Sequence, residues 1–187
     1  MNSPETGVPV FFLKPETALL LRNRPFYYPE YSKEIHYETE LVIRINRNGK
    51  HIREAFAQGY YDEIGIGLDL TARDLQRNCR ELGLPWEIAK GFDSSAPISQ
   101  FIPINDLPNR NNIAFSLKKN GTEVQTGQSS NMIFSFDKII EYVSKFITLK
   151  MGDIIFSGTP AGVGPIEIGD RLEAYIESKK MLTMLVK

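Results

Sequence analysis

Two Asn-Gly pairs, at 48–49 and 120–121, most constrain how this 187-residue chain can fold. Each pair follows a run of alternating apolar residues, and Asn-Gly after such a run favours a tight β-hairpin turn. We therefore expect a strand at 37–46 before the first pair, and strands at 113–118 and 122–126 around the second. Similar runs predict further strands at 8–14, 64–69, 153–157, 171–177 and 181–186.

Two longer segments have the periodicity of helices. The first, 71–82, starts at Thr71, which can cap a helix, and is followed by Gly83, which can end one. The second, 136–149, places five apolar side chains on one helical face: Ile139, Ile140, Val143, Phe146 and Ile147. Because helices and strands do not alternate regularly, a doubly wound parallel sheet is disfavoured, and we predict an α+β fold dominated by β-structure.

The composition is that of an ordinary folded domain. Apolar residues make up 42% of the chain and charged residues 24%, with a net charge of −1, so we expect one domain over 1–187. No basic run or membrane-spanning stretch is present, and we therefore expect neither nucleic acid nor a membrane as partner. The N-terminal residues resemble neither a secretion signal nor a presequence, and the single Cys79 cannot form an internal disulfide, which favours the cytoplasm.

Three acidic residues give the clearest chemical signal. Glu38 and Glu40 are two residues apart in a predicted strand, so they point to the same face, and Asp69 ends the predicted strand 64–69. Three converging carboxylates offer the oxygen ligands that Mg²⁺ prefers. The same alternation also fits a half-buried strand with a solvated outer face, and spacing alone does not decide between these interpretations.

Three further residues could belong to a site next to Asp69. Arg73 and Gln76 share one face of the predicted helix 71–82, where they can reach a ligand near the helix start or lie in solvent. Lys90 stands between small residues, and the default expectation for a lysine is exposure.

The loop 157–164 and the histidines give weaker signals. The glycine-rich loop can offer backbone N–H groups and the Thr159 hydroxyl to a carboxylate, or it can be a plain turn. His36 shares a strand face with the two glutamates, so it can orient them by a hydrogen bond without binding the metal itself. With only His36 and His51 in the chain, an imidazole-rich iron, zinc or copper site is disfavoured relative to a hard cation.

Five ordered motifs resemble the fumarylacetoacetate hydrolase family. They are H-Y-E-T-E-L-V (36–42), G-L-D-L-T-A-R-D-L-Q (67–76), L-P-W-E-I-A-K-G-F (84–92), Q-S-S-N-M-I-F-S (128–135) and G-D-I-I-F-S-G-T-P-A-G-V-G (152–164). The likeness is to short, single-domain members of the acylpyruvate hydrolase or oxaloacetate decarboxylase type. It implies a mixed β-sandwich roll, a homodimer, bound Mg²⁺ or Mn²⁺, and substrates that are 2-oxo acids with a second carbonyl or carboxylate.

The resemblance also implies a role for individual residues. Its metal carboxylates fall on Glu38, Glu40 and Asp69, its substrate-polarising lysine on Lys90 and its glutamine on Gln76, while Arg73 and Thr159 match positions that face the substrate. One part of the pattern is not matched. Such members usually carry a His-x-x-Glu lid pair thought to activate the attacking water, and no histidine precedes His36 here.

The activity that the resemblance implies is metal-dependent cleavage of a C–C bond in a 2-oxo acid, by acylpyruvate hydrolysis or oxaloacetate decarboxylation. Since the hydrolytic water needs a general base, the unmatched lid pair favours decarboxylation. Two alternatives remain open. One is an isomerase or decarboxylase of aromatic catabolism that acts on a 2-hydroxyhepta-2,4-diene-1,7-dioate type of acid. The other is a metal-dependent binder of 2-oxo acids without catalysis.

Overall fold

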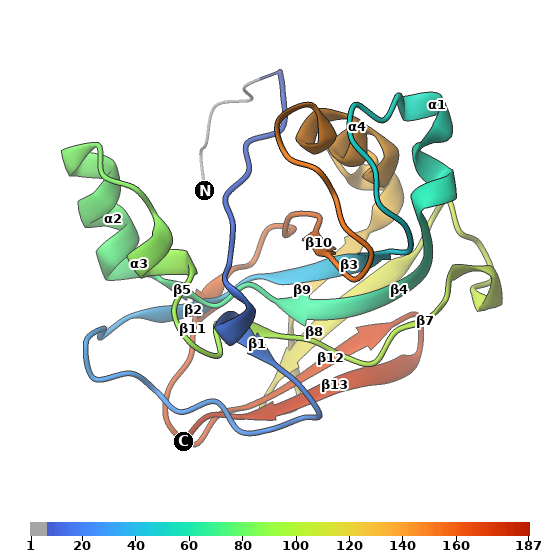
Figure 1. Ribbon diagram of the computed structural model, residues 1–187. Helices are drawn as coiled ribbons and strands as arrows, with labels where there is room; N and C mark the ends of the chain where they lie inside the picture. The colour runs from blue at the N-terminus through green and yellow to red at the C-terminus, as the bar shows by residue number, and fades with distance from the viewer. Residues whose placement is uncertain (1–6) are drawn as a thin grey trace.

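The computed structural model describes residues 7–187, and strands outnumber helices among them (Figure 1). The helices are α1 (Glu54–Ala57), α2 (Arg73–Leu82), α3 (Glu87–Lys90) and α4 (Phe136–Phe146). Short 3-10 turns lie at η1 (Glu16–Ala18), η2 (Gln58–Tyr60), η3 (Ile104–Asp106) and η4 (Ser129–Asn131).

The strands form sheets that are mainly antiparallel, as predicted for an α+β fold. One sheet has the order β10 (Ile154–Phe156), β3 (Thr39–Ile45), β4 (Tyr61–Leu68), β7 (Ile102–Pro103). A second has the order β13 (Lys179–Leu185), β12 (Arg171–Ile176), β8 (Ala114–Lys119), β9 (Thr122–Gln128). A smaller sheet joins β11 (Gly164–Pro165), β2 (Ile35–Tyr37) and β5 (Thr71–Ala72), and β1 (Leu19–Leu20) pairs in parallel with β6 (Ala96–Pro97).

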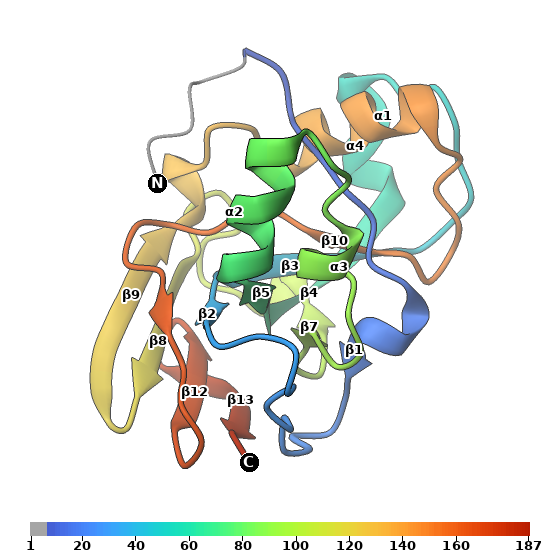
Figure 2. The same ribbon diagram turned by 90° about the vertical axis from the view of Figure 1, so that its left-hand side faces the viewer.

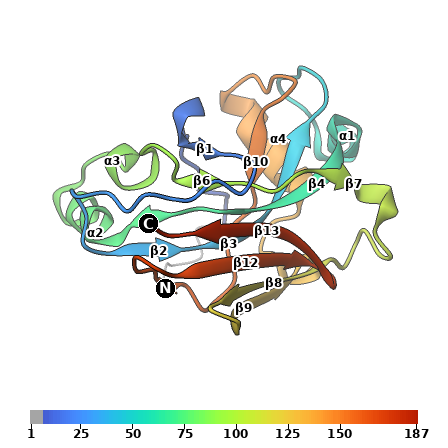
Figure 3. The ribbon, with the colours of Figure 1, turned by 90° about the horizontal axis from the view of Figure 1, so that it is seen from below.

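The helices lie at the two ends of the sheets rather than over one face. Figures 1 and 3 show α2 with α3 at one end and α1 with α4 at the other. The apolar core joins both large sheets into one cluster, which includes Leu41, Ile43, Ile66, Leu117, Leu172 and Met184. Cys79 is fully buried on α2. Over residues 7–187, no helix has the length and apolar character needed to cross a membrane.

The two Asn-Gly pairs differ in outcome. The second forms the predicted hairpin between β8 and β9, with left-handed φ values of 52° at Asn120 and 83° at Gly121. The first does not, and that prediction was wrong. β3 does pair with β4, but the connection between them contains α1 and η2, and Gly49 forms a bridge to Leu149 instead.

The predicted strand at 8–14 is also wrong. These residues form an arm without strand pairing that passes between α3 and α4 (Figure 2). The arm is held by side chains rather than by its backbone: the Phe11 ring lies 6.3 Å from Tyr142 on α4, and the Phe12 ring lies 6.2 Å from Trp86 just before α3. Pro9, which has no N–H to donate, also weakens backbone pairing there.

Both longer helices are shorter than predicted. α2 begins at Arg73, because Thr71 is used in β5 and does not cap the helix, and it ends as expected at Gly83 with φ 66°. α4 ends at Phe146, so Ile147 lies beyond it. Phe146 is 58% exposed, and the buried stripe of α4 is therefore narrower than its sequence pattern indicates.

Candidate active site

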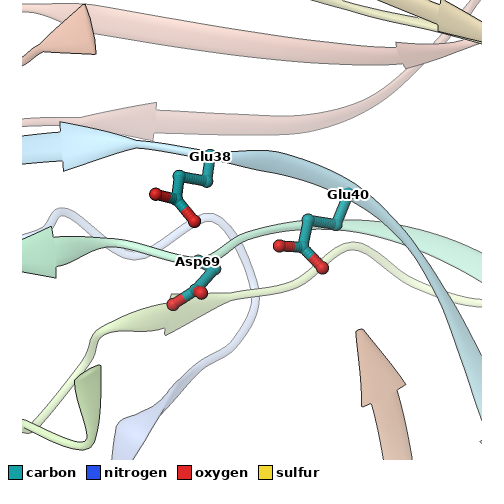
Figure 4. Close-up of side chains that lie close together, drawn as sticks. All are labelled: Glu38, Glu40 and Asp69. Atoms are coloured by element: carbon teal, nitrogen blue, oxygen red, sulfur yellow. The ribbon is translucent and has the colours of Figure 1, made fainter. Parts of the chain in front are cut away.

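Glu38, Glu40 and Asp69 come together in the structure (Figure 4). Glu38 lies between β2 and β3, Glu40 lies on β3, and Asp69 directly follows β4, the strand that pairs with β3. Each residue offers a carboxylate oxygen, and these oxygens all lie within 4.8 Å of one another. The three residues are only 3–5% exposed, so the interpretation of a solvated strand face is wrong.

The pairing of β3 with β4 sets this convergence. The Asp69 N–H donates to the Glu38 carbonyl at 2.8 Å, which continues the strand contact beyond the end of β4. Gly67 allows the close approach of a neighbouring ring, since a Cβ there would lie 2.6 Å from Phe156 on β10. The main-chain register of β3 and β4 alone therefore brings the three acidic residues close together.

Lys90, the last residue of α3, is buried against the acids, so the default expectation of an exposed lysine is wrong. Its ammonium group donates to Asp69 Oδ2 at 2.6 Å, to Glu38 Oε2 at 2.9 Å and to the Thr71 hydroxyl at 2.7 Å. Burial lowers the pKa of Lys90, but the charges of Asp69 and Glu38 outweigh it, and the net direction is upward. Lys90 therefore remains protonated.

Arg73 and Gln76 lie at the start of α2, and both are buried rather than solvated. The Arg73 guanidinium donates to Glu38 Oε1 and, at 2.6 Å, to Gln76 Oε1. Because one guanidinium holds both partners, the Gln76 amide is fixed beside the acidic cluster. Of the two alternatives left open by the sequence, the structure excludes a solvated face and joins these residues to the acids.

Glu40 has a different environment from the other two acids. It accepts a hydrogen bond from the Gly158 N–H at 2.6 Å, which shows that the loop 157–164 is more than a plain turn. Burial, followed by the charges of Asp69 and Glu38, raises the pKa of Glu40 to about 8. Gly158 has φ 97°, a left-handed value that favours glycine at this contact.

Thr159 lies next to Gly158 but turns its hydroxyl into the protein. The hydroxyl donates to the Thr39 carbonyl at 2.9 Å and accepts from the Gln125 amide at 2.9 Å. Gln125 in turn accepts from the Thr39 N–H at 3.0 Å. This network holds the loop against β3, and the role of Thr159 as a substrate contact stays a prediction.

His36 lies within reach of the charges of Arg73 and Glu38, but its hydrogen bond goes to another residue. Its Nε2 atom lies 3.0 Å from Glu34 Oε1, and Glu34 also pairs with Arg77 on the outer side of α2. The hydrogen bond of His36 is therefore made away from the carboxylate cluster.

Sequence reasoning missed Lys14, on the N-terminal arm. Its ammonium group hydrogen bonds to the Ser95 carbonyl at 3.1 Å, to the Ser95 hydroxyl at 2.8 Å and to the Lys90 carbonyl. It also lies 2.8 Å from Asp69 Oδ1. Lys14 stands in the short stretch F-F-L-K-P, which has no periodicity that predicts a site residue. Its contact with Asp69, 55 residues later in the chain, therefore could not be predicted from local sequence.

The carboxylates retain capacity for a cation although Lys14, Lys90 and Arg73 are close. Within the described part of the chain, Asp69 Oδ1 is a buried oxygen that accepts no hydrogen bond. Lys14 forms an ion pair with this oxygen at 2.8 Å and shares its ammonium with acceptors on Leu70, Lys90 and Ser95. Three buried carboxylates whose oxygens converge within 4.8 Å, one of them a glutamate with a raised pKa, fit a hard divalent cation with oxygen ligands.

Comparison with known proteins decides the family. Residues 1–186 match the family model described as fumarylacetoacetate (FAA) hydrolase, C-terminal. The chain belongs to the fumarylacetoacetate hydrolase family. The mitochondrial oxaloacetate tautomerase of Mus musculus is 44% identical over 187 residues, which cover all of this chain and 85% of the mouse protein. The oxaloacetate tautomerase of Escherichia coli K12 is 40% identical, again over all of this chain and 85% of its own length.

A solved structure supports the same assignment. The fumarylpyruvate hydrolase from Pseudomonas aeruginosa, in complex with Mn²⁺ and pyruvate, superposes with a TM-score of 0.90 at 36% identity, over 98% of this chain and 80% of that one. The predicted fold class is thereby confirmed as that of the fumarylacetoacetate hydrolase C-terminal domain. The chain is an enzyme of this family.

Proposed function

We propose that this fumarylacetoacetate hydrolase family member uses a divalent cation, Mg²⁺ or Mn²⁺, to turn over a 2-oxo acid that carries a second carbonyl or carboxylate. The buried cluster of Glu38, Glu40 and Asp69, with Lys90 bound to two of them, carries this proposal. The three acids would hold the cation. When bound, a divalent cation acts as a Lewis acid on the substrate's oxygen atoms.

In this proposal Lys90 stabilises the oxygen that gains negative charge during the reaction. Its ammonium group stays protonated and is held in place by Asp69, Glu38 and Thr71, so it needs little reorganisation when charge develops. Gln76, fixed by Arg73, offers an amide to the same region, and it is the second residue to which we assign a catalytic role.

Substrate binding is assigned to Arg73 and to the loop at Thr159. Arg73 provides the planar cation that suits a carboxylate, and it already lies beside Glu38 in the cluster. Since the Thr159 hydroxyl is occupied by Thr39 and Gln125, we expect the loop to contact a substrate carboxylate through its main chain more than through that hydroxyl.

Oxaloacetate is the first substrate to test. In tautomerisation a proton leaves C3 and a proton joins the 2-oxo oxygen, which gives the enol. The names of the mouse and Escherichia coli relatives favour this reaction. In decarboxylation the C3–C4 bond breaks, CO₂ leaves, and the electron pair moves towards the same oxygen. Both reactions increase the negative charge on the 2-oxo oxygen, and in this proposal Lys90 stabilises that oxygen.

C–C bond cleavage, by decarboxylation or by hydrolysis of an acylpyruvate, is the second candidate. The relative from Pseudomonas aeruginosa, a fumarylpyruvate hydrolase with Mn²⁺ and pyruvate, favours it. In hydrolysis water adds to the distal carbonyl, the C–C bond breaks, and protonation of the departing carbon yields pyruvate. This reaction requires a general base in addition to the residues named above.

The test compares reactions on one protein preparation. Enol absorbance follows oxaloacetate tautomerisation, a lactate dehydrogenase assay follows pyruvate from oxaloacetate or acetylpyruvate, and a 2-hydroxyhepta-2,4-diene-1,7-dioate substrate tests isomerisation. We expect turnover that requires Mg²⁺ or Mn²⁺ and falls at least a hundredfold in Asp69→Asn and Glu40→Gln. Turnover that survives metal chelation and both substitutions contradicts the proposal. Oxalate binding without turnover of any substrate would identify a binder instead.

We also propose a homodimer, from the family resemblance. Several large apolar side chains are more than half exposed, among them Val10 (68%), Ile133 (74%) and Ile168 (73%), and an interface would cover some of them. Sedimentation velocity at micromolar concentration should give twice the 21.2 kDa chain mass. A monomer at that concentration contradicts this part of the proposal.

A further inference from the structure

Lys90 stands on an element too short to fix its position. α3 is a single turn of four residues, Glu87–Lys90, and an isolated turn of helix is unstable in water. The main chain changes direction directly after it, through residues 91–95, before β6 begins. The direction of the Lys90 side chain therefore depends on contacts made by other parts of the chain.

The N-terminal arm supplies two of those contacts. Lys14 donates to the Lys90 carbonyl and to both oxygens of Ser95, so one ammonium joins the two ends of the turn that follows α3. Phe12, two residues earlier, places its ring 5.0 Å from the Lys90 ammonium. The arm thus contacts the main chain and the side chain of Lys90 at once.

Lys14 is well suited to hold Lys90 and poorly suited to act on a substrate. Its ammonium group donates to the Lys90 carbonyl, to both oxygens of Ser95 and, at 3.5 Å, to the Leu70 carbonyl, and it forms an ion pair with Asp69. All of its donor capacity is therefore used within the protein. Its side chain is only 12% exposed. The 2.8 Å ion pair with Asp69 Oδ1 also places the positive charge of Lys14 beside the carboxylate that accepts from Lys90.

We propose that Lys14 is a positioning residue for Lys90: from the arm it fixes the turn between Lys90 and Ser95 above Asp69 and so aims the Lys90 ammonium at the acids. The inference rests on the proposed function, because Lys14 acts on the reaction only through Lys90. Lys14 itself does not touch the substrate.

Removing the Lys14 ammonium should leave the fold intact, because the two carbonyls that it holds in the turn have other donors. The Lys90 carbonyl also accepts from the Ser95 hydroxyl at 2.8 Å, and the Ser95 carbonyl accepts from the Leu70 N–H at 2.9 Å. Lys14→Met keeps the length of the side chain and removes only its charge and donors. Lys179→Met, at an exposed position on β13, is the matched control.

The first readout is the chemical reactivity of Lys90 itself. Acetylation by a trace of acetic anhydride, followed by mass spectrometry, should modify Lys90 at least five times faster in Lys14→Met than in the wild type, with exposed Lys33 as internal reference. The Lys179→Met control should match the wild type. Equal reactivity of Lys90 in Lys14→Met and wild type overturns the proposal, whatever the enzyme's substrate proves to be.

The second readout separates positioning from metal binding. With oxaloacetate and Mn²⁺, Lys14→Met should lower kcat at least tenfold and change KM less than threefold, while the Mn²⁺ dissociation constant stays equal or becomes smaller. Unchanged kcat, or loss of Mn²⁺ binding with Lys90 reactivity unchanged, contradicts the proposal. If the wild type turns over no 2-oxo acid, the proposed function fails and the acetylation result alone decides the role of Lys14.

Ser95→Ala provides a second variant should Lys14→Met fold poorly. It removes one acceptor of Lys14 and one donor to the Lys90 carbonyl, and it leaves both lysines in place. We expect the same changes as in Lys14→Met, namely faster acetylation of Lys90 and lower kcat with near-normal KM. Each change should be smaller than in Lys14→Met. A Ser95→Ala enzyme with wild-type reactivity at Lys90 would contradict the role of this turn.

Discussion

Glu40 is the residue whose environment most depends on what the site binds. Glu38 and Asp69 each contact two cationic side chains, whereas the contact found for Glu40 is the neutral Gly158 N–H. Burial and the two neighbouring acids raise the pKa of Glu40 to about 8. In the protein without metal, Glu40 is therefore protonated at neutral pH, and a divalent cation must displace that proton.

Mn²⁺ binding should consequently depend on pH. Below pH 8 each bound ion releases about one proton from Glu40, so the dissociation constant should rise roughly tenfold for each unit by which pH falls. Titrations followed by the electron paramagnetic resonance of free Mn²⁺, between pH 6 and pH 9, test this. Glu40→Gln should bind Mn²⁺ more weakly and with a much smaller pH dependence. A wild-type dissociation constant that is constant from pH 6 to pH 8 contradicts the assignment.

The same shift determines how the stability of the metal-free protein changes with pH. The folded pKa of Glu40 lies above the ordinary value of 4.5, so the folded state binds the proton more tightly than the unfolded state. This contribution to the free energy of unfolding is fully present below about pH 4.5, and it is lost as pH rises through 8. Urea unfolding at pH 6 and pH 9, for wild type and Glu40→Gln, should show the loss only in the wild type.

At the scale of elements, the pair β3 and β4 does most to build the site. Their register places Glu40 opposite Gly67, and the chain reaches Asp69 two residues later. Glycine at position 67 is needed because the Phe156 ring of β10 occupies the space next to it, with ring carbons 2.6 and 2.9 Å from where a Cβ would lie. The packing of β10 and the position of Asp69 are therefore linked.

Gly67→Ala should destabilise the protein and weaken Mn²⁺ binding together. Overpacking of this kind costs about 1–3 kcal/mol, which corresponds to a fall in Tm of roughly 2–12 °C for a chain of this length. The double variant Gly67→Ala with Phe156→Leu, which removes the colliding ring atoms, should regain part of the loss relative to Phe156→Leu alone. Thermal unfolding checks the result, and a Gly67→Ala protein as stable as the wild type would show that the ring is not a constraint.

The elements that form from local sequence differ from those that depend on distant partners. Local signals predicted the hairpin at Asn120-Gly121, the helix end at Gly83 and the strand before Asp69, because each depends on a few neighbouring residues. The wrong predictions, a hairpin at Asn48-Gly49 and a strand at 8–14, depend on distant partners. Gly49 pairs with Leu149, and the arm packs by its rings against α4.

The site shows the same division. The spacing of Glu38 and Glu40 indicated a shared face, but burial of that face results from other segments packing over it, and local sequence contains no measure of this. Lys90 was expected in solvent and is buried. Local sequence could not show this, because the hydrogen-bond partners of Lys90 lie 19 to 52 residues away in the chain. The family resemblance placed these residues together, whereas residue spacing alone left the alternatives open.

At the scale of the whole molecule, the cluster concentrates charge in an otherwise apolar interior. Lys14, Lys90 and Arg73 pair there with the carboxylates of Glu38 and Asp69, and taking so many charges from water is costly even when they are paired. A cation that binds only the folded state should stabilise the protein through mass action.

Mn²⁺ at 100 times its dissociation constant should add about 2.7 kcal/mol to the free energy of unfolding, or roughly 5–10 °C in Tm for a chain of this length. Differential scanning fluorimetry with Mn²⁺, Mg²⁺ and chelator measures the shift. Asp69→Asn, which retains the shape of the side chain but lacks its charge, should show little or no shift under the same conditions. A shift of equal size in this variant would place the stabilising ion elsewhere.

The most direct test of the central claim is anomalous diffraction at the manganese edge from crystals soaked with Mn²⁺ and oxalate. If the three acids hold the ion, one strong anomalous peak should appear among the carboxylate oxygens of Glu38, Glu40 and Asp69, with oxalate bound to the ion on the side of Lys90 and Arg73. No peak at that position, with the three acids still paired only to Lys14, Lys90 and Arg73, would contradict it.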